Sequence, residues 1–483
     1  MLRRRLMSQS LPTSSDRLRG VVRLAVVAQV LLVVAGLRHH LAWGESPRLP
    51  FSLRPWLDAL ETGCLVGFVW LGTRAWWRGM AGVDRDAPAR RLVWLSVPIL
   101  LAAMLVPPFL SMDAFDYVMR GRVQALHGGN PYVQVAADFP DDPFVAYGDA
   151  AWKSFPLPYG PVLANVQAGV AWLAHWFESL PRPGELIIAV LLFKLLFAAA
   201  LLASALLARS VAAVLRPGSE NRSFVAILWN PLLLAEGVAN AHNEPLVLVC
   251  LFAALATACT GRAATSVFAL GVGVLTKIVP VLLLPLWCVH ALRQRRTVAC
   301  GLGLLATAAF AGVFYWQFFR VEGSLQFLRR QSELQGGSLL WGLQNVTGIG
   351  FGTLLTIGRV LVVLLLASEA LRLWKRSELE VLVRATAVVL AALVAFGVTL
   401  FGPWYHVWWV PVALLLGHGY LYRVACIATV TAPLGYMLWT GFRRLDEPAQ
   451  WTMWCMGLLV PALGGVLWRG HVLPPVNERA AAG

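Results

Sequence analysis

Residues 111–161 read SMDAFDYVMRGRVQALHGGNPYVQVAADFPDDPFVAYGDAAWKSFPLPYGP, and this polar, carboxylate-rich segment stands between long apolar runs. The rest of the chain is so hydrophobic that a charged segment of this length needs a functional reason. The segment opens where an apolar run ends, which places its first carboxylates at the edge of a bilayer. Such a segment is typical of chemistry on a substrate that is itself held in lipid.

Composition indicates a membrane protein. Hydrophobic residues make up 58% of the 483 residues and charged residues only 13%, well away from the averages of soluble domains. Apolar runs near the length of about 20 residues that spans a bilayer recur along the chain. The sequence therefore predicts an all-α polytopic membrane protein with about 12–14 transmembrane helices. The formal net charge of +15 does not indicate nucleic-acid binding, because the arginines cluster between apolar runs, where they orient the protein.

Two of the apolar segments differ from a single helix that crosses the membrane once. The candidate spans are residues 21–43, 58–77, 92–110, 186–208, 223–239, 244–260, 298–319, 353–374, 381–401, 404–420, 424–441 and 449–468. Residues 162–177 are too short, and they predict an interfacial or partly inserted helix. Residues 265–292 contain Lys277 and Pro280 in their middle, and they predict a helix broken near that point.

The distribution of arginines orients these segments, because positive loops remain in the cytoplasm. The arginine-rich loop 74–91 is assigned to the cytoplasm, so the segment that begins at residue 111 is external. Arginines at both ends of residues 262–296 require the broken helix to enter the membrane and return. The predicted topology then brings together on one external face Asp113, the turn 240–244, Lys277, the loop 320–352 and the segment 404–406.

The predicted organisation has five parts, with both termini in the cytoplasm. They are a cytoplasmic tail (1–20), three transmembrane spans (21–110), an external catalytic loop with interfacial helices (111–185), a transmembrane bundle with an external loop at 320–352 (186–468), and a cytoplasmic tail (469–483).

Asp113 and Asp116 are the candidate catalytic residues. Their spacing of three places both carboxylates on one face of a helix. An alternative is that they cap the helix or favour its positive end. Capping does not explain Tyr117, Arg120 and Arg122, which follow on the same short helix and are candidate substrate-binding residues.

Several polar residues elsewhere are further candidates for substrate binding. His242, Asn243 and Glu244 form a polar turn, and the alternative is an ordinary helix–helix turn. Glu236 lies inside an apolar run, where a carboxylate is costly and usually faces a partner or a cavity. Lys277 is suited to hold an anionic group such as a lipid phosphate, or its ammonium extends to the membrane surface.

The remaining candidates each have a structural alternative as well. They are Asn130 and Tyr132 of GGNPY, Tyr159 of PYGP, Arg329 and Arg330, and Tyr405 and His406 of PWYH. Gly- and Pro-rich motifs of this kind are turns by composition. The arginine pair is equally compatible with a solvated helix face, and the aromatic run with a membrane-interface belt.

Taken in order, these motifs resemble those of a known family. The motifs concerned are DAFDYVMRGRV, GGNPY, PYGP, NP followed by NAHNE, LTKIVPVLLLP and PWY. They are similar to motifs of the GT-C-fold glycosyltransferases that use polyprenyl-phosphate sugars. The resemblance is greatest to the bacterial polyprenol-phosphate-mannose-dependent α-mannosyltransferases, and it covers residues 90–420. It implies a GT-C-like bundle in the bacterial plasma membrane with an extracytoplasmic active site. It also implies that Asp113 is the general base, although Asp116 remains an alternative.

The chemistry that the residues allow agrees with this resemblance. A carboxylate can take the proton of an acceptor hydroxyl on a glycan or glycolipid. Lys277, Arg329 or Arg330 can stabilise the charge on a departing phosphate. A single displacement inverts the anomeric centre, and mannose is the sugar that the resemblance implies.

The sequence leaves open a metal cofactor and two rival functions. A divalent metal bridging phosphate to Asp116, His242 or Glu244 is compatible with the sequence, but no ligand spacing requires one. A nucleotide-binding fingerprint is not evident. The rival functions are a lipid-linked sugar flippase or solute transporter, and a non-catalytic scaffold, because broken helices and intramembrane charges also occur in transporters.

Overall fold

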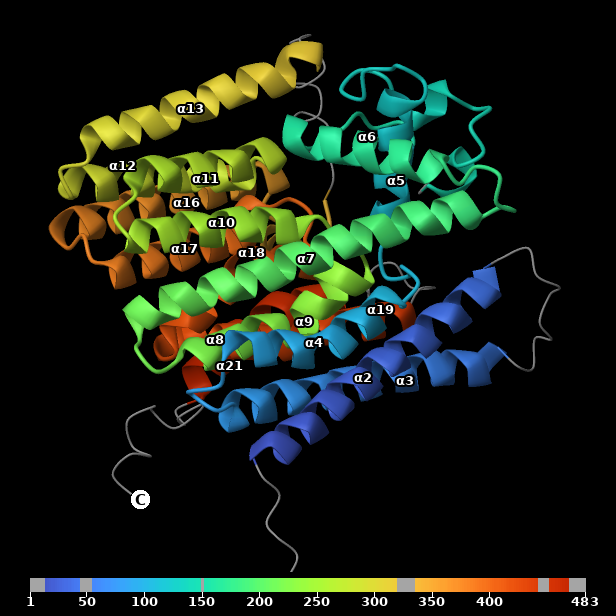
Figure 1. Cartoon of the computed structure of the whole chain (residues 1–483), viewed down its shortest axis with the longest axis horizontal. Coiled ribbons are helices and arrows are strands. Elements are labelled where there is room, and N and C mark those ends of the chain that lie inside the picture. Colours follow the sequence, from blue (N-terminus) through green and yellow to red (C-terminus); the bar gives the residue numbers. More distant parts are fainter. Residues whose placement is uncertain (1–13, 44–53, 149–151, 319–334, 442–450, 469–483) are drawn as a thin grey trace, which may run out of the picture.

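The computed structural model describes residues 14–43, 54–148, 152–318, 335–441 and 451–468. Within these ranges the chain is helical, and its only extended pairing is a pair of isolated bridges from Gly336 and Gly337 to Leu400. Figure 1 shows the helices stacked side by side with their axes in broadly similar directions. The prediction of an all-α polytopic membrane protein is confirmed.

Helices make up most of the described ranges. The first half of the chain contains α2 (Ser14–Trp43), α3 (Arg54–Gly82), α4 (Ala89–Met104), α5 (Asp113–Ala125), η2 (Ala136–Asp138), η3 (Val145–Tyr147), α6 (Pro161–His175), α7 (Gly184–Leu215), α8 (Glu220–Leu228), α9 (Pro231–Leu234) and η4 (Ala235–Ala239). The second half contains α10 (Glu244–Cys259), α11 (Ala263–Thr276), η5 (Val279–Leu283), α12 (Leu284–Arg293), α13 (Thr297–Tyr315), η6 (Trp316–Phe318), α15 (Leu339–Thr347), α16 (Phe351–Lys375), α17 (Leu379–Ala392), η7 (Leu393–Gly397), η8 (Pro403–Tyr405), α18 (His406–Leu416), α19 (Gly419–Gly441), η9 (Cys455–Leu459) and α21 (Val460–Leu467).

Five helical segments in the described ranges are long and apolar enough to cross a membrane. They are Asp16–His39, Gly184–Leu215, Thr297–Phe318, Phe351–Lys375 and Leu379–Gly397. Others, such as α10, are apolar but shorter, and short spans are compatible with breaks at functional positions. The total of 12–14 spans stays a prediction.

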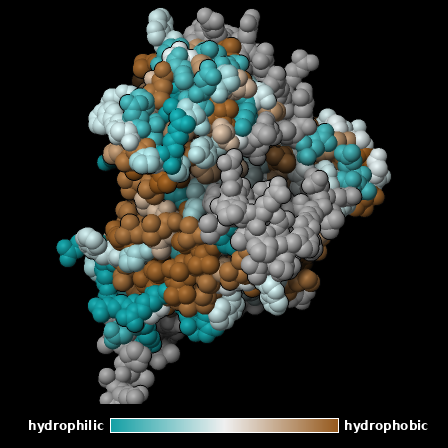
Figure 2. All heavy atoms as spheres, turned by 90° about the vertical axis from the view of Figure 1, so that its right-hand side faces the viewer, coloured by the Kyte–Doolittle hydropathy of each residue, from teal (hydrophilic) through white to brown (hydrophobic). Residues whose placement is uncertain are grey.

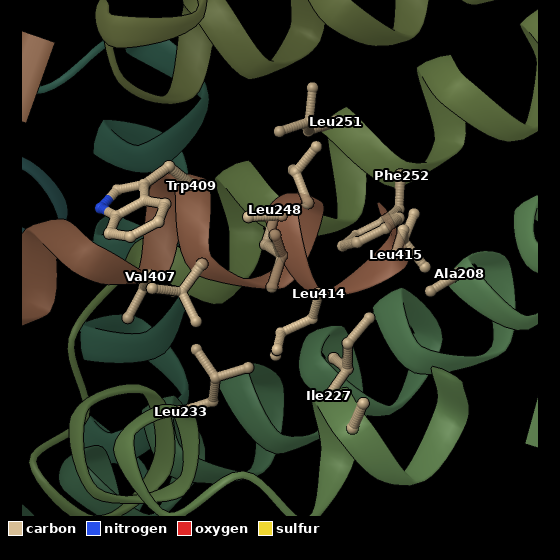
Figure 3. Close-up of a cluster of buried hydrophobic side chains, with 14 of the residues drawn as sticks. Ala208, Ile227, Leu233, Leu248, Leu251, Phe252, Val407, Trp409, Leu414 and Leu415 are labelled. Carbon is tan, nitrogen blue, oxygen red and sulfur yellow. The ribbon is translucent and has the colours of Figure 1, made fainter. Parts of the chain in front are cut away.

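The centre of the bundle is α18, whose side chains are all buried. Its sequence HVWWVPVALLL is apolar on every face, which is typical of a helix enclosed by protein on all sides. Figure 3 shows Leu414 and Leu415 of α18 among Leu248 and Phe252 of α10 and Ile227 of α8. This core fixes the start of α18, and with it the short helix η8 that precedes it.

The segment 111–185 is a compact helical unit built on α5, α6 and the start of α7. Arg122 of α5 pairs with Asp142 (Nε–Oδ2 2.9 Å) and with Glu185 at the beginning of α7, and all three side chains are largely buried. The Arg122 guanidinium also lies 4.3 Å from the centre of the Phe144 ring. Arg122 therefore joins the loop to the bundle and holds α5 in place.

The predicted break in the helix of residues 265–292 is present. Helix α11 ends at Thr276, Lys277 is extended, and η5 leads into α12. In Figure 1 the α10–α11 and α12–α13 turns lie at the same end of the bundle. The chain therefore runs to the break and returns, and Pro280 follows the break as expected.

The PYGP turn packs directly against this break. Gly160 N donates a hydrogen bond to Thr276 O at 3.0 Å. A Cβ at Gly160 would lie 2.0 Å from Leu275 O, so only glycine allows this approach. The contact places Tyr159 beside Lys277.

The end of the molecule that holds α5 and α6 faces the viewer in Figure 2. Hydrophilic residues gather on the upper part of this face, and a largely hydrophobic surface lies below them. On this face a hydrophilic surface therefore lies next to an apolar one.

Close packing of α5 on α6 predicts a specific sensitivity at Gly121. A Cβ there would lie 2.2 Å from Gln167 O, which is a backbone atom and cannot rotate away. We expect Gly121→Ala to lower the free energy of unfolding by about 1–3 kcal/mol, as overpacking does. Thermal unfolding in detergent measures this loss. The matched control is Gly169→Ala on α6, where the space is open, and a loss as large in the control would contradict the prediction.

Candidate active site

Asp113 is the first residue of α5, and its carboxylate is directed toward the bundle. Oδ1 accepts a hydrogen bond from the Ser111 hydroxyl at 3.1 Å, and Oδ2 accepts one from the Tyr117 hydroxyl at 3.2 Å. The residue preceding α5 makes no side-chain cap, so the helix is not capped by either predicted aspartate. A quarter of the Asp113 side-chain surface is exposed, which leaves the carboxylate accessible to a ligand.

His242 lies behind Asp113 and is completely buried. Its Nδ1 is 3.3 Å from Asp113 Oδ2, and its Nε2 is 3.4 Å from Glu236 Oε2. The ring stacks on Trp404 of η8, with centroids 4.7 Å apart and planes inclined by 21°. One imidazole therefore joins carboxylates from α5 and η4 on the surface of a third element.

The local backbone explains why His242 reaches this position. The chain forms a π-helix at η4, and His242 N donates to Glu236 O at 3.0 Å. Ala241 has a φ of +56°, a left-handed conformation that is uncommon for a residue with a Cβ. π-Helices and strained residues both cluster at functional sites. The irregular backbone turns His242 back over Glu236.

Lys194 holds this irregular turn against the end of α4. It is buried in α7, and its ammonium donates to Ala239 O at 2.5 Å and to Val106 O. These carbonyls belong to backbone that has left regular helical hydrogen bonding. These contacts give Lys194 a structural role.

The electrostatic balance keeps Asp113 ionised. Burial alone would raise the pKa of Asp113, but the hydrogen bond and charge of His242, followed by the charge of Lys277, lower it to about 2. Burial alone would lower the pKa of His242, yet the neighbouring carboxylates of Asp113, Glu236 and Glu244 raise it above its usual value of 6.5. The pair is therefore stabilised as carboxylate and imidazolium.

A second pair lies beside the first. Lys277 Nζ is 2.5 Å from Glu244 Oε1, and the ammonium lies 5.4 Å from the ring centres of both Tyr159 and Trp408. Aromatic faces stabilise such a cation. Glu244 is the first residue of α10, where the helix dipole favours its negative charge. Lys277 thus has a positive charge on the aromatic wall of the site.

Tyr117 and Asn243 connect the two pairs. Asn243 Nδ2 donates to the Tyr117 hydroxyl at 2.8 Å, and that hydroxyl donates to Asp113. The Tyr117 ring packs edge-on against Tyr159, with centroids 5.7 Å apart. The structure therefore brings together Asp113, Tyr117, Tyr159, His242, Asn243, Glu244 and Lys277 from the sequence candidates.

Asp116 is placed differently from Asp113. Arg120 donates to it from Nε at 2.9 Å and approaches it from Nη2 at 2.7 Å, and both side chains are largely buried. Arg120 also donates to Phe155 O at 3.1 Å. This ion pair stabilises the packing of α5 against the external loop.

The other described candidates make contacts within the protein. Asn130 Oδ1 accepts from Tyr132 N at 3.0 Å, and the Tyr132 hydroxyl donates to Tyr159 O at 3.0 Å, so both residues shape the loop beneath Tyr159. Tyr405 stacks on Trp408 at 4.6 Å. His406 accepts from Trp409 Nε1 at 2.9 Å, and its Nε2 is 2.9 Å from Gly457 O.

Two candidates, Arg329 and Arg330, lie outside the residues that the structure describes. Within the described ranges, no group of three or more His, Cys, Asp or Glu side chains is arranged to hold a metal ion. Lys277 is a cation that the described part of the site offers to an anionic group.

Sequence reasoning did not assign Trp404 or Ser111 to the site. PWYH was interpreted mainly as an interfacial aromatic belt, although Trp404 supports His242. Its position at the external end between two spans was the available signal. Glu236 was noted as an intramembrane carboxylate but not assigned a partner, because the sequence predicts the turn at 240–244 but not which of its side chains lies over Glu236.

Comparisons with known proteins identify the family of this chain. Residues 17–293, more than half of the chain, match the sequence profile described as "Alpha-(1->6)-mannopyranosyltransferase, N-terminal domain". Alpha-(1->6)-mannopyranosyltransferase A of Mycobacterium tuberculosis is 24% identical over 82% of this chain and 80% of its own length. A probable alpha-(1->6)-mannopyranosyltransferase of Mycolicibacterium smegmatis is 28% identical over 40% of this chain and 32% of its own. The resemblance to GT-C-type mannosyltransferases is confirmed, and the chain belongs to the alpha-(1->6)-mannopyranosyltransferase family as a multi-pass membrane mannosyltransferase.

Proposed function

We propose that this mannosyltransferase moves a mannosyl group from a polyprenyl-phosphate donor to an acceptor hydroxyl on the extracytoplasmic face of the membrane. The observation that supports this most strongly is a partly exposed carboxylate, Asp113, on the same aromatic cluster as an ammonium, Lys277. The Tyr117 hydroxyl donates to Asp113, and the Tyr117 ring packs against Tyr159, whose ring centre lies 5.4 Å from Lys277 Nζ. Transfer from a sugar phosphate requires a base for the acceptor hydroxyl and a positive charge for the departing phosphate, and these two side chains can supply them.

Asp113 acts as the general base of the transfer. The acceptor oxygen attacks the anomeric carbon while its proton passes to the Asp113 carboxylate. The bond from the anomeric carbon to the phosphate oxygen breaks, and its electron pair stays on the phosphate. Attack opposite the leaving group inverts the anomeric centre, so a β-linked donor gives an α-linked product. The names of the relatives suggest the 6-hydroxyl of a mannose-containing glycan or glycolipid as acceptor.

Lys277 receives the departing phosphate. Its ammonium is held by Glu244 and two aromatic rings, so it needs little reorganisation when charge develops on the phosphate oxygens. Aromatic walls around the ammonium exclude water and strengthen its attraction to an anion. A lipid-linked donor fits this place, because η5 and α12 after Lys277 are apolar and partly exposed.

The orientation rests on the arginine-rich loops. Residues 74–91 and 293–296 are predicted to be cytoplasmic, and Figure 1 shows the α3–α4 and α12–α13 connections at the opposite end of the bundle from α5 and α6. The site then faces the cell exterior or periplasm. Lipid-linked sugars suit that compartment, because they bring an activated sugar across the membrane.

The donor can be tested directly. Purified protein in nanodiscs is incubated with a mannan-type acceptor and radiolabelled mannose, supplied either as β-linked polyprenyl-phosphate mannose or as a nucleotide-linked sugar. We expect label in the acceptor only with the lipid-linked donor, and an α-linkage by nuclear magnetic resonance. Transfer from the nucleotide sugar alone, or a β-linked product, would overturn the proposed donor or stereochemistry.

The base is tested by Asp113→Asn. This change keeps the size of the side chain but removes its proton acceptor, so turnover should fall by about 10²- to 10⁴-fold. Asp116→Asn is the matched control, because it weakens a buried ion pair and should lower thermal stability more than turnover per folded molecule. The opposite result, with an active Asp113→Asn and a folded but inactive Asp116→Asn, would assign the base to Asp116.

The phosphate-binding role is tested by Lys277→Met. Loss of a charged hydrogen bond worth about 1.5–3 kcal/mol should raise the KM for the lipid-linked donor by about tenfold to a hundredfold. Because this change also leaves Glu244 unpaired, the double variant Lys277→Met/Glu244→Gln is the necessary control. If the double variant regained the donor KM of the unmodified protein, Lys277 would serve only to neutralise Glu244.

A further inference from the structure

A general base does not need a buried histidine behind it, yet His242 occupies that place behind Asp113. A general base needs a carboxylate within reach of the acceptor, and many carboxylates are held by backbone groups alone. In this protein a fully buried imidazole connects Asp113 to a second carboxylate, Glu236, which is also fully buried. The arrangement extends from α5 through the NAHNE turn to η4.

The contacts of Asp113 show what this imidazole does to the carboxylate. Oδ2 receives two groups, the Tyr117 hydroxyl at 3.2 Å and His242 Nδ1 at 3.3 Å, whereas Oδ1 receives one, the Ser111 hydroxyl at 3.1 Å. Each carboxylate oxygen offers about two lone-pair sites. Oδ2 therefore faces two groups of the protein, and Oδ1, which faces one, has a site for an incoming hydroxyl.

We propose that His242 is a positioning residue for the transfer, held as an imidazolium by Glu236, and that its contact with Asp113 Oδ2 leaves Oδ1 as the oxygen that takes the acceptor proton. This inference rests on the proposed role of Asp113 as base. His242 touches neither donor nor acceptor in this scheme. It determines which edge of the carboxylate faces the acceptor and keeps that carboxylate ionised.

The groups around His242 support its charged form. Asp113 on α5, Glu236 on η4 and Glu244 on α10 all raise its pKa, against the effect of burial. The nearby cations Lys277 and Lys194 are already occupied, one by Glu244 and the other by the backbone carbonyls of Ala239 and Val106. The imidazolium is then a counter-ion that Asp113 and Glu236 share.

Glu236 is informative because a carboxylate is costly to bury. A neutral glutamine of the same size could accept a hydrogen bond from His242 without the desolvation cost of a charge. A buried carboxylate is stabilised by a positive neighbour, and Glu236 Oε2 lies 3.4 Å from His242 Nε2. The stacked Trp404 ring at 4.7 Å adds a second stabilising contact, since indole faces attract cations, and it fixes the plane of the imidazole.

The pH dependence of turnover tests this role. The imidazolium is present below the raised pKa of His242 and is lost as pH rises through it, so kcat of the unmodified protein should fall on the alkaline side, above pH 6.5. Glu236→Gln removes one counter-ion, lowers that pKa, and should move the alkaline limb of kcat to lower pH. His242→Gln should lower kcat by up to about a hundredfold, leave the donor KM within about threefold, and abolish the limb.

The control is His406→Gln. His406 is a second buried histidine, but its nitrogens contact Trp409 and Gly457 O. Its replacement can change stability, whereas the shape of the pH profile should stay that of the unmodified protein. Thermal unfolding of every variant separates folding losses from catalytic ones, and Glu236→Gln keeps the test valid if His242→Gln does not fold.

The outcomes distinguish this inference from the proposed function. The role of His242 would be overturned if the alkaline fall of kcat stayed at the same pH in Glu236→Gln, or if that fall persisted in His242→Gln. Asp113 would remain the base in either case. An active Asp113→Asn would instead overturn the base itself. A raised donor KM in His242→Gln with unchanged kcat would make His242 a donor-binding residue, contrary to the proposal.

Discussion

The charge balance around Asp113 is the constraint on which the site depends. Carboxylates inside an apolar helical bundle are stable only with a partner, because burial disfavours the charged form. His242 lies 3.3 Å from Asp113 and 3.4 Å from Glu236, and Lys277 neutralises Glu244. These partners come from segments far apart in the chain. Satisfying the charges therefore requires α5, η4, α10 and the α11 break to meet at one place.

The sequence predicted the class of the fold and the convergence of several polar segments that are distant in the chain. Apolar runs and arginine-rich loops indicated the polytopic helical bundle, and Lys277 with Pro280 in the middle of an overlong run indicated the broken helix. The same reasoning brought Asp113, the 240–244 turn and Lys277 together. These inferences succeeded because length, hydropathy and helix breaks are local properties, and the membrane leaves few alternatives for a polar residue.

Pairing between side chains could not be predicted in the same way. Asp113 and Asp116 look equivalent in the sequence, since both lie in the first turn of one helix. Only packing shows that Asp116 is neutralised by Arg120 within α5 while Asp113 faces another element. Trp404 was similarly hidden in an aromatic run, because a stacking partner is a property of three dimensions.

Irregular backbone concentrates where the chemistry is proposed. The π-helix η4, the left-handed Ala241 and the extended Lys277 each interrupt a helix that would otherwise present only apolar side chains. A continuous helix buries its own polar backbone but cannot bring consecutive side chains to one point. Interrupting it costs hydrogen bonds, which Lys194 partly restores at Val106 and Ala239. The breaks are thus how an apolar bundle places charged groups beside α5 without unfolding around them.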